Sequence, residues 1–221
     1  MVDSYTVYFA GDLFDHKHLT GNFLLASAIE RTGAGRYVCV LPQHLEQVTH
    51  RAAAIRNQDL KQVVSCDIAL FNFDGTDLDS GTVVEFMMAK FLDIPSVVLR
   101  TDFRAAGDQQ KDGDPWNLMC SFYPRTRIVR IHAMAWQQEA WRAGGTPDEI
   151  AGRLYKRMAG VVVEALDTVR GEPSLVAGDV SWAERLYAWA ARFPGGDLSA
   201  VCTPDFLTEI VAQKHRKGLL G

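Results

Sequence analysis

Acidic side chains gather in one stretch of the sequence, Asp74–Glu85 (DGTDLDSGTVVE), which contains no Lys or Arg. A phosphate would be repelled there, whereas the hydroxyls of a sugar would find hydrogen-bond acceptors. Glu85 is the carboxylate of greatest chemical interest, because it lies in an otherwise apolar run near the start of a predicted helix. The helix dipole keeps a carboxylate ionised at such a position. An ionised carboxylate can attack the anomeric carbon of a sugar, as the nucleophiles of retaining glycosidases do.

Glu85 also has a purely structural interpretation. The segment Thr82–Glu85 matches the capping box, in which a Glu returns a hydrogen bond to the start of its helix. Asp79 and Ser80 are equally acceptable helix N-caps. On local pattern alone, the capping role is the favoured interpretation of Glu85.

Two further segments hold candidate functional residues. Asp59 would pass as a surface helix residue, but beside a nucleophile it becomes a candidate acid that protonates a departing base. Gly11 and Phe14 follow the first predicted strand, where a glycine lets the backbone approach a ligand closely, and they are candidate substrate contacts. This loop is not G-x-G-x-x-G, so no dinucleotide site is predicted. His16 and His18 match no common spacing of metal ligands, so no metal site is predicted either.

These residues require a scaffold that brings the ends of several strands together. Short apolar runs predict strands at Tyr5–Ala10, Tyr37–Leu41, Asp67–Phe73, Ser96–Leu99 and Arg127–Ile131. Helical patterns alternate with them at Thr20–Thr32, Leu45–Val64 and Gly81–Leu92, and a short turn is expected at Trp116–Ser121. Strands that are apolar on both faces and alternate with helices indicate a parallel sheet sandwiched by helices. We therefore expect a five-stranded flavodoxin-like or Rossmann-like α/β fold with strand order 2-1-3-4-5, and ligands at the carboxyl ends of the strands.

The pattern changes after residue 146. Helical stripes follow at Asp148–Arg170, Trp182–Phe193 and Pro204–Lys217. We therefore divide the chain into an α/β domain of residues 1–146 and a C-terminal helical extension of residues 147–221, whose purpose the sequence does not reveal. Its aromatic residues are expected in a core rather than in a platform for base stacking: Trp182, Tyr187, Trp189 and Phe193.

Composition narrows the classes of partner. The chain has 221 residues, 48% of them hydrophobic, and a net charge of -4, which argues against a nucleic-acid partner. No apolar stretch approaches the roughly 20 residues that span a bilayer, and the N-terminus lacks a leader pattern. The four cysteines are scattered without a C-x-x-C pair, which favours a reducing compartment. We expect a cytoplasmic protein that acts on a small molecule.

Over roughly residues 5 to 132, the sequence resembles the nucleoside 2-deoxyribosyltransferase family. Four blocks in the family's order carry the resemblance: Tyr8–Gly11 (YFAG), Asn57–Asp59 (NQD), Asp79–Glu85 (DSGTVVE) and Asn117–Met119 (NLM). Each block is weak alone, but the four in this order are fairly specific. The Asp-x-Gly-Thr-x-x-Glu form is similar to that of protozoal and related bacterial members.

The resemblance implies a role for each matching residue. Glu85 matches the nucleophile that forms a 2-deoxyribosyl ester, and Tyr8 matches the tyrosine that holds and tunes it. Asp59 matches the carboxyl group that manages the proton of the base. Asp79 matches the residue that accepts the sugar 5'-hydroxyl.

The resemblance also implies an assembly and a reaction. Asn117 and Met119 match residues that a neighbouring subunit lends to the pocket, which implies a homo-oligomer built from dimers, such as a hexamer. The family needs no cofactor. The expected substrates are a 2'-deoxyribonucleoside and a free purine or pyrimidine base. The free base replaces the base of the nucleoside with retention of configuration at C1', as part of nucleoside salvage.

Different functions on the same fold remain open. A related family hydrolyses nucleoside 5'-monophosphates and typically has Ser where Asp79 stands. An Asp there should repel a phosphate, but Ser80, also a candidate substrate contact, keeps this function open. Nucleoside hydrolysis and a non-catalytic nucleoside sensor stay open as well. Small family members complete the pocket with their carboxyl terminus. Because the chain here continues beyond that point, the sequence does not determine which base the enzyme accepts.

Overall fold

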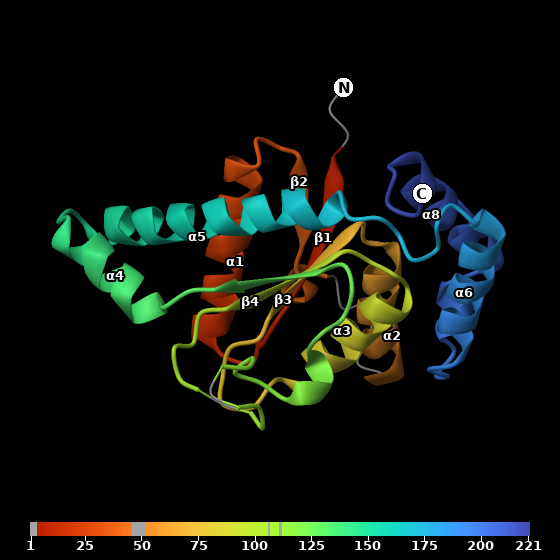
Figure 1. Cartoon of the computed structure of the whole chain (residues 1–221), viewed down its shortest axis with the longest axis horizontal. Helices are drawn as coiled ribbons and strands as arrows, with labels where there is room; N and C mark the ends of the chain where they lie inside the picture. The colour runs from red at the N-terminus through yellow and green to blue at the C-terminus, as the bar shows by residue number, and fades with distance from the viewer. Residues whose placement is uncertain (1–3, 46–51, 106, 111) are drawn as a thin grey trace.

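A parallel β-sheet forms the centre of the molecule (Figure 1). The computed structural model describes residues 4–45, 52–105, 107–110 and 112–221. Over these residues five strands form one sheet in the order β2-β1-β3-β4-β5, with every neighbouring pair parallel. The strands are β1 (Tyr5–Ala10), β2 (Tyr37–Val40), β3 (Ile68–Asn72), β4 (Ser96–Arg100) and β5 (Thr126–Arg130). The flavodoxin-like α/β fold and its strand order are confirmed, and each strand begins and ends within one residue of its prediction.

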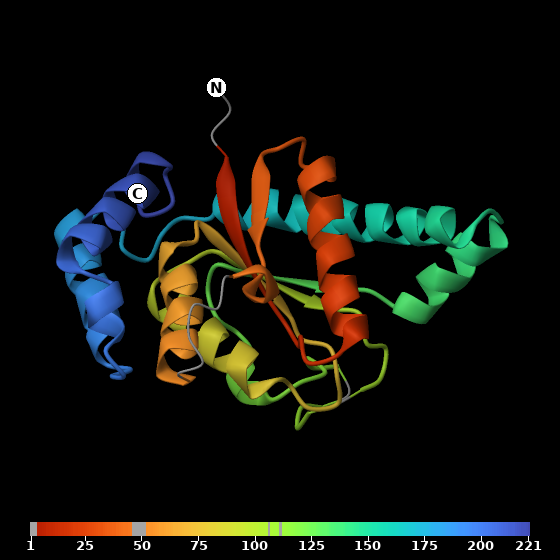
Figure 2. The ribbon, with the colours of Figure 1, turned by 180° about the vertical axis from the view of Figure 1, so that it is seen from behind.

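Helices cover both faces of the sheet (Figures 1 and 2). One face carries α1 (His16–Thr32) and α5 (Pro147–Arg170), and the other carries α2 (Ala52–Ser65) and α3 (Ser80–Phe91). The alternation of side chains along β1 sends Val7 into the core with α1 and α5, and Tyr8 into the core with α2 and α3. The pleat of β1 therefore determines that Tyr8 faces α3, the helix that carries Glu85.

Two helices begin at other residues than the sequence predicts. Helix α1 starts at His16 rather than Thr20, because the Asp15 side chain caps it and accepts hydrogen bonds from the backbone N–H groups of Lys17 and His18. Helix α2 is described from Ala52, after a short 3-10 turn η1 (Pro42–His44). The part of the predicted helix between residues 46 and 51 lies outside the described residues.

The C-terminal part contains more helix than the sequence predicts. Helix α4 (Ala133–Arg142) was not predicted, and α6 (Val180–Arg192), α7 (Leu198–Val201) and α8 (Pro204–Arg216) follow α5. Helix α5 lies on the sheet, whereas residues of α6–α8 share a core with α2 and α3. The domain boundary at residue 147 stays a prediction. Beyond it, both α5 and the group α6–α8 pack against the α/β part of the chain.

The aromatic residues of α6 do not share one environment. Tyr187 is fully buried, as predicted, but Trp182, Trp189 and Phe193 are each more than 40% exposed. The prediction of a common core was wrong for these three, because the same helical spacing also places residues beside, rather than within, the buried stripe. The rings of Trp189 and Phe193 stack on each other, with their centroids 4.6 Å apart.

None of the described helices is both long and apolar enough to cross a membrane. The described residues also contain no group of three or more His, Cys, Asp or Glu side chains that could hold a metal ion.

Candidate active site

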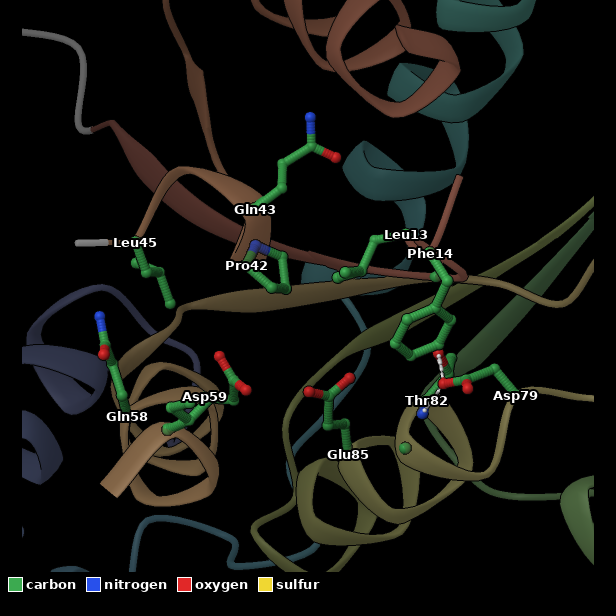
Figure 3. A pocket seen from close by; sticks show the side chains of 13 residues that line it. Leu13, Phe14, Pro42, Gln43, Leu45, Gln58, Asp59, Asp79, Thr82 and Glu85 are labelled. Carbon is green, nitrogen blue, oxygen red and sulfur yellow. Dashed lines mark hydrogen bonds between the residues drawn. The ribbon is translucent and has the colours of Figure 1, made fainter. Parts of the chain in front are cut away.

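A cavity of about 270 Å³ opens at the carboxyl end of the sheet (Figure 3). Its walls come from the segments after β1 and β2, from α2 and from the start of α3. It is lined by Gly11, Leu13, Phe14, Pro42, Gln43, Leu45, Ile55, Gln58, Asp59, Asp79, Gly81, Thr82 and Glu85. The cavity lies where a doubly wound sheet binds its ligands, because the strand order reverses at β1 and β3.

Glu85 is held by a tyrosine from the centre of the sheet. The hydroxyl of Tyr8, on β1, donates a hydrogen bond of 2.6 Å to Glu85 Oε1. Tyr8 itself is completely buried. The Glu85 carboxylate therefore has a fixed oxygen on the Tyr8 side, and Figure 3 shows its carboxylate and that of Asp59 directed toward each other across the cavity.

The capping-box interpretation of Glu85 is wrong. Asp79 is the N-cap of α3, and its Oδ2 accepts hydrogen bonds from Thr82 N at 2.7 Å and from Thr82 Oγ1 at 2.9 Å. This confirms the interpretation in which Asp79 begins the helix. Glu85 thus lies in the second turn, where its side chain has no part in capping and is available to the cavity.

Burial changes the acidity of the two facing carboxyl groups. Burial raises the pKa of Glu85 to about 7. The hydrogen bond from Tyr8 lowers this pKa, and the negative charges of Asp59 and Asp79 raise it further. Burial also raises the pKa of Asp59 to about 6. Burial, followed by the charge of Glu85, raises the pKa of Tyr8 well above its usual value. The pair Asp59 and Glu85 can therefore hold one proton near neutral pH, and the higher pKa of Glu85 places that proton more often on Glu85 than on Asp59.

The cavity brings together most of the residues that the sequence singled out. Gly11, Phe14, Asp59, Asp79 and Glu85 all line it, and Tyr8 contacts it through Glu85.

Three predicted contacts lie elsewhere. Ser80, Asn117 and Met119 line a second hollow of about 890 Å³. Asn117 caps the 3-10 turn η2 (Leu118–Cys120) by accepting a hydrogen bond from Met119 N at 2.9 Å, and Met119 is 73% exposed. The two hollows lie on opposite faces of α3, because the α3 residues that line them are about half a helical turn apart. Within one chain, Asn117 and Met119 do not line the cavity of Glu85.

Sequence reasoning missed Gln43 as a wall residue of the cavity. Its Nε2 donates to Leu19 O at 2.9 Å, and its Oε1 is buried without a hydrogen-bond partner among the described residues. The available signal was its position just after β2, at the carboxyl edge of the sheet. Gln58, another wall residue, belongs to the Asn57–Asp59 block, but the sequence indicated no role for it.

The chain is similar to known proteins in sequence and in fold. The model of the family described as nucleoside 2-deoxyribosyltransferase matches residues 7–119. Among solved structures, a conserved protein from Enterococcus faecalis V583 is similar at 21% identity and a TM-score of 0.49, over 70% of this chain and 99% of that chain. A 2-desoxiribosyltransferase from Leishmania mexicana is similar at 20% identity and a TM-score of 0.45, over 56% of this chain and 89% of that chain. No curated protein matches the chain. The family match spans just over half of the sequence, and the chain belongs to the nucleoside 2-deoxyribosyltransferase family.

Proposed function

We propose that the protein is a nucleoside 2-deoxyribosyltransferase that exchanges the base of 2'-deoxyribonucleosides, in nucleoside salvage, through an ester between the sugar and Glu85. The observation that carries this proposal is the carboxylate of Glu85, fixed by Tyr8 at 2.6 Å and facing Asp59 across a nucleoside-sized cavity. Membership of the family supports chemistry on the bond between sugar and base.

In the first step, Glu85 displaces the base. Because Tyr8 holds Oε1, we assign the attack on C1' to Oε2 of Glu85. The new bond from Oε2 to C1' forms as the bond from C1' to the base nitrogen breaks, and the electron pair of that bond leaves with the base. Protonated Asp59 donates its proton to the departing base, so that a neutral base is released.

In the second step, another base displaces Glu85. A nitrogen of the incoming base attacks C1' from the face that the first base left, and the ester bond breaks with its electrons returning to Glu85. Asp59, now ionised, accepts the proton of the incoming base. Two displacements at C1' retain its configuration, as in retaining glycosidases.

The walls of the cavity offer contacts to the substrate. Asp79 uses Oδ2 for its helix cap, and Oδ1 remains to accept the sugar 5'-hydroxyl. Gln43 contributes to the wall after β2, with its carboxamide directed away from Asp59 and Glu85 (Figure 3). Gly11 and Phe14 complete the wall after β1.

A neighbouring subunit completes the site in this proposal. Leu118 and Met119 of η2 are 48% and 73% exposed, and Phe122, which follows η2, is 83% exposed, so this stretch presents apolar side chains that a partner can cover. A dimer in which η2 reaches the partner's cavity would supply Asn117 and Met119 there. It would also exclude the water that competes with the incoming base.

The proposal is tested by incubating the purified protein with thymidine, with and without adenine, and separating the products by chromatography. We expect deoxyadenosine in the presence of adenine and far slower release of thymine without it. A matched sample of Glu85→Gln, in which an amide of the same shape replaces the nucleophile, should form no deoxyadenosine. Full exchange by Glu85→Gln would contradict the nucleophile, and absence of exchange with thymidine and with deoxyinosine would contradict the transferase.

A nucleoside hydrolase is the second candidate, and the exposure of Phe14 favours it. Phe14 lines the cavity and is 79% exposed, so this wall of the cavity is open to water in a single chain. In the same experiment, thymine release at one rate with or without adenine would assign hydrolysis rather than transfer.

A further inference from the structure

The turn between α6 and α7 is bound to α2 directly beside Asp59. Asn57 Nδ2 donates a hydrogen bond to the carbonyl oxygen of Gly196. Arg56 Nη2 donates to Pro194 O at 2.9 Å, and Arg56 Nη1 donates to Gly195 O at 3.4 Å. Three successive carbonyl groups of the turn therefore accept from two successive side chains of α2.

Asn57 lies on the far side of α2 from the cavity. Successive residues of an α-helix are rotated by about 100°, so Asn57 and Asp59 lie on nearly opposite sides of the helix. Asn57 is 5% exposed, whereas Asp59 lines the cavity. Because a single helical turn is rigid, a bond that fixes Asn57 also fixes the rotation of α2 and the height of Asp59 above Glu85.

The turn is itself held by a packed core. Leu198 and Cys202, which follow it, are buried in the same cluster as Leu60 and Val64 of α2. Before the turn, the hydroxyl of Tyr187 on α6 donates to Leu92 O, at the end of α3, at 3.2 Å. The turn is thus anchored to both helices that line the cavity, and it can resist displacement of α2.

From this geometry we infer that the Pro194–Gly196 turn of the C-terminal extension is a positioning element for Asp59, acting through Asn57 and Arg56. Its role in base exchange rests on the proposed function. The extension thereby has a purpose that its own sequence does not reveal: it fixes the rotation of the helix that presents the proton donor to the base.

Two neighbouring glycines provide a matched test. Gly195 and Gly196 have nearly equal positive φ angles of 63° and 62°, so alanine strains the backbone equally at both. A Cβ at Gly196 would come within 2.8 Å of Arg56 Nη1, whereas a Cβ at Gly195 would meet nothing within 4 Å. Arg56 Nη1 is the end of a flexible side chain that can move aside, so Gly196→Ala weakens the contact of Arg56 with the turn, and Gly195→Ala controls for backbone strain. Asn57→Ala removes the buried hydrogen bond by a second route.

The first readout does not depend on activity. The carboxyl group of Asp59 is titrated by carbon NMR in protein with labelled aspartate, and its signal is assigned with Asp59→Asn. The titratable groups that interact with Asp59 are Glu85 on α3 and Tyr8 on β1. Loosening α2 admits water to Asp59, so we expect its pKa to fall by about half a unit or more in Gly196→Ala and Asn57→Ala, but not in Gly195→Ala. Equal Asp59 titration in the wild type and all three variants would overturn the inference.

The second readout is kinetic. In Gly196→Ala and Asn57→Ala, kcat for exchange should fall about tenfold while KM for thymidine changes little, because proton transfer to the base is affected more than binding. Gly195→Ala should keep the wild-type kcat, and a kcat equal to that of Gly196→Ala would overturn the inference. A wild-type protein without any exchange would defeat the proposed function instead, and the Asp59 titration would still decide the positioning role. Thermal unfolding of each variant identifies any that fails to fold, and the remaining variant then decides.

Discussion

At the scale of single residues, the proposed mechanism depends on which of Glu85 and Asp59 holds the one proton that they share. In the proposed mechanism, attack on C1' requires ionised Glu85, and departure of the base requires protonated Asp59. Burial raises the pKa of Glu85 to about 7 and that of Asp59 to about 6, so between these values the pair carries mainly one proton. The higher pKa places that proton more often on Glu85, and the reactive arrangement, with the proton on Asp59, is the less populated one. The two titrations are coupled, and the observed limbs of a pH profile belong to the pair. Exchange should therefore be fastest near neutral or slightly acidic pH and fall on both sides.

Tyr8→Phe should lower the rate below neutral pH and move the alkaline limb of this profile to higher pH. The hydrogen bond from Tyr8 favours the ionised form of Glu85 and lowers its pKa, so removing the hydroxyl raises that pKa. Below neutral pH, kcat/KM should fall about tenfold or more, because a hydrogen bond to a charged group is lost. The measurement is kcat/KM for thymidine and adenine from about pH 5 to about pH 9. An unchanged kcat/KM below neutral pH, with the alkaline limb in place, would remove Tyr8 from its role.

Asp79→Ser should separate the two tasks of Asp79. Serine caps a helix about as well as aspartate, so the free energy of unfolding should change by only a few tenths of a kcal/mol. The carboxylate that we propose as the acceptor of the sugar 5'-hydroxyl is lost, so thymidine turnover should fall about tenfold to a hundredfold. The substitution also removes the charge that repels phosphate, so thymidine monophosphate should become a better substrate. Steady-state kinetics with both compounds provide the test, and unchanged thymidine kinetics would contradict the assignment.

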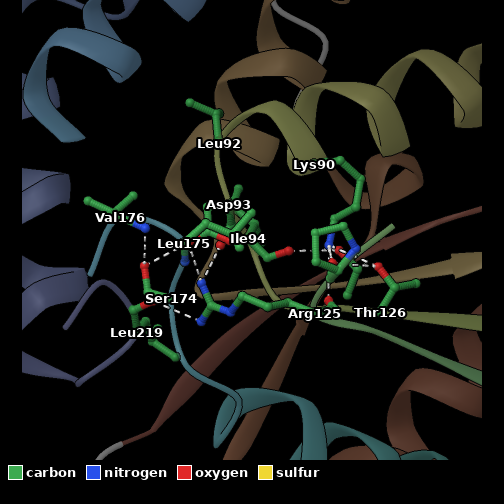
Figure 4. Close-up of polar contacts among 12 residues, drawn as sticks. Lys90, Leu92, Asp93, Ile94, Arg125, Thr126, Ser174, Leu175, Val176 and Leu219 are labelled. Atoms are coloured by element: carbon green, nitrogen blue, oxygen red, sulfur yellow. Dashed lines mark hydrogen bonds and ion pairs between the residues drawn. The ribbon is translucent and has the colours of Figure 1, made fainter. Parts of the chain in front are cut away.

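At the scale of elements, a buried ion pair joins the sheet to the segment that leads into α6 (Figure 4). Arg125, just before β5, donates to Asp93 Oδ2 at 2.8 Å and to Leu219 O at 2.9 Å. Asp93 Oδ2 also accepts from Ser174 Oγ at 2.7 Å and from Leu175 N at 2.8 Å. One carboxylate oxygen thus connects the start of β5, the link between α5 and α6, and, through Arg125, the end of the chain.

Asp93→Ala should therefore be strongly destabilising. It leaves the guanidinium of Arg125 buried without its anion, which costs about 3–5 kcal/mol. Ser174→Ala removes one neutral donor from the same network and should cost about 1 kcal/mol. Urea unfolding followed by circular dichroism compares the two variants directly. If Asp93→Ala were no less stable than Ser174→Ala, the ion pair would not hold these elements together.

The strands could be predicted from the sequence because their signal is local. Runs such as Ile68–Asn72 are apolar on both faces, and the buried parallel sheet requires this. Helix α4 is amphipathic, so its apolar spacing was a signal that sequence reasoning missed. The start of α1 was missed because the Asp15 cap lies in a polar stretch. Glu85 shows the same limit at the site. Its partner Tyr8 is 77 positions away, so a local pattern favoured capping and only the order of the four blocks indicated catalysis.

At the scale of the whole molecule, α2 and α3 lie between the sheet and the helices α6–α8 (Figure 1). The cavity of Glu85 opens on one face of α3, and the hollow lined by Asn117 and Met119 lies on the opposite face. The substrate contacts that we propose for Asn117 and Met119 would therefore be made in another subunit's cavity. In a twofold dimer each η2 segment would reach the partner, so that both sites are shared in the same way.

Mixing two inactive variants tests this sharing. Glu85→Ala lacks the nucleophile, and Asn117→Ala lacks the residue that we expect a neighbour to lend, so each should lose most of its exchange activity. In a mixed dimer, one site has both substitutions and the other has both native residues, so the isolated mixed dimer should regain about half of the wild-type activity. The measurement is thymidine and adenine exchange after the differently tagged variants are co-expressed and the mixed oligomer is isolated. Mixed oligomers that stay inactive, or Asn117→Ala alone with full activity, would show that each chain completes its own site.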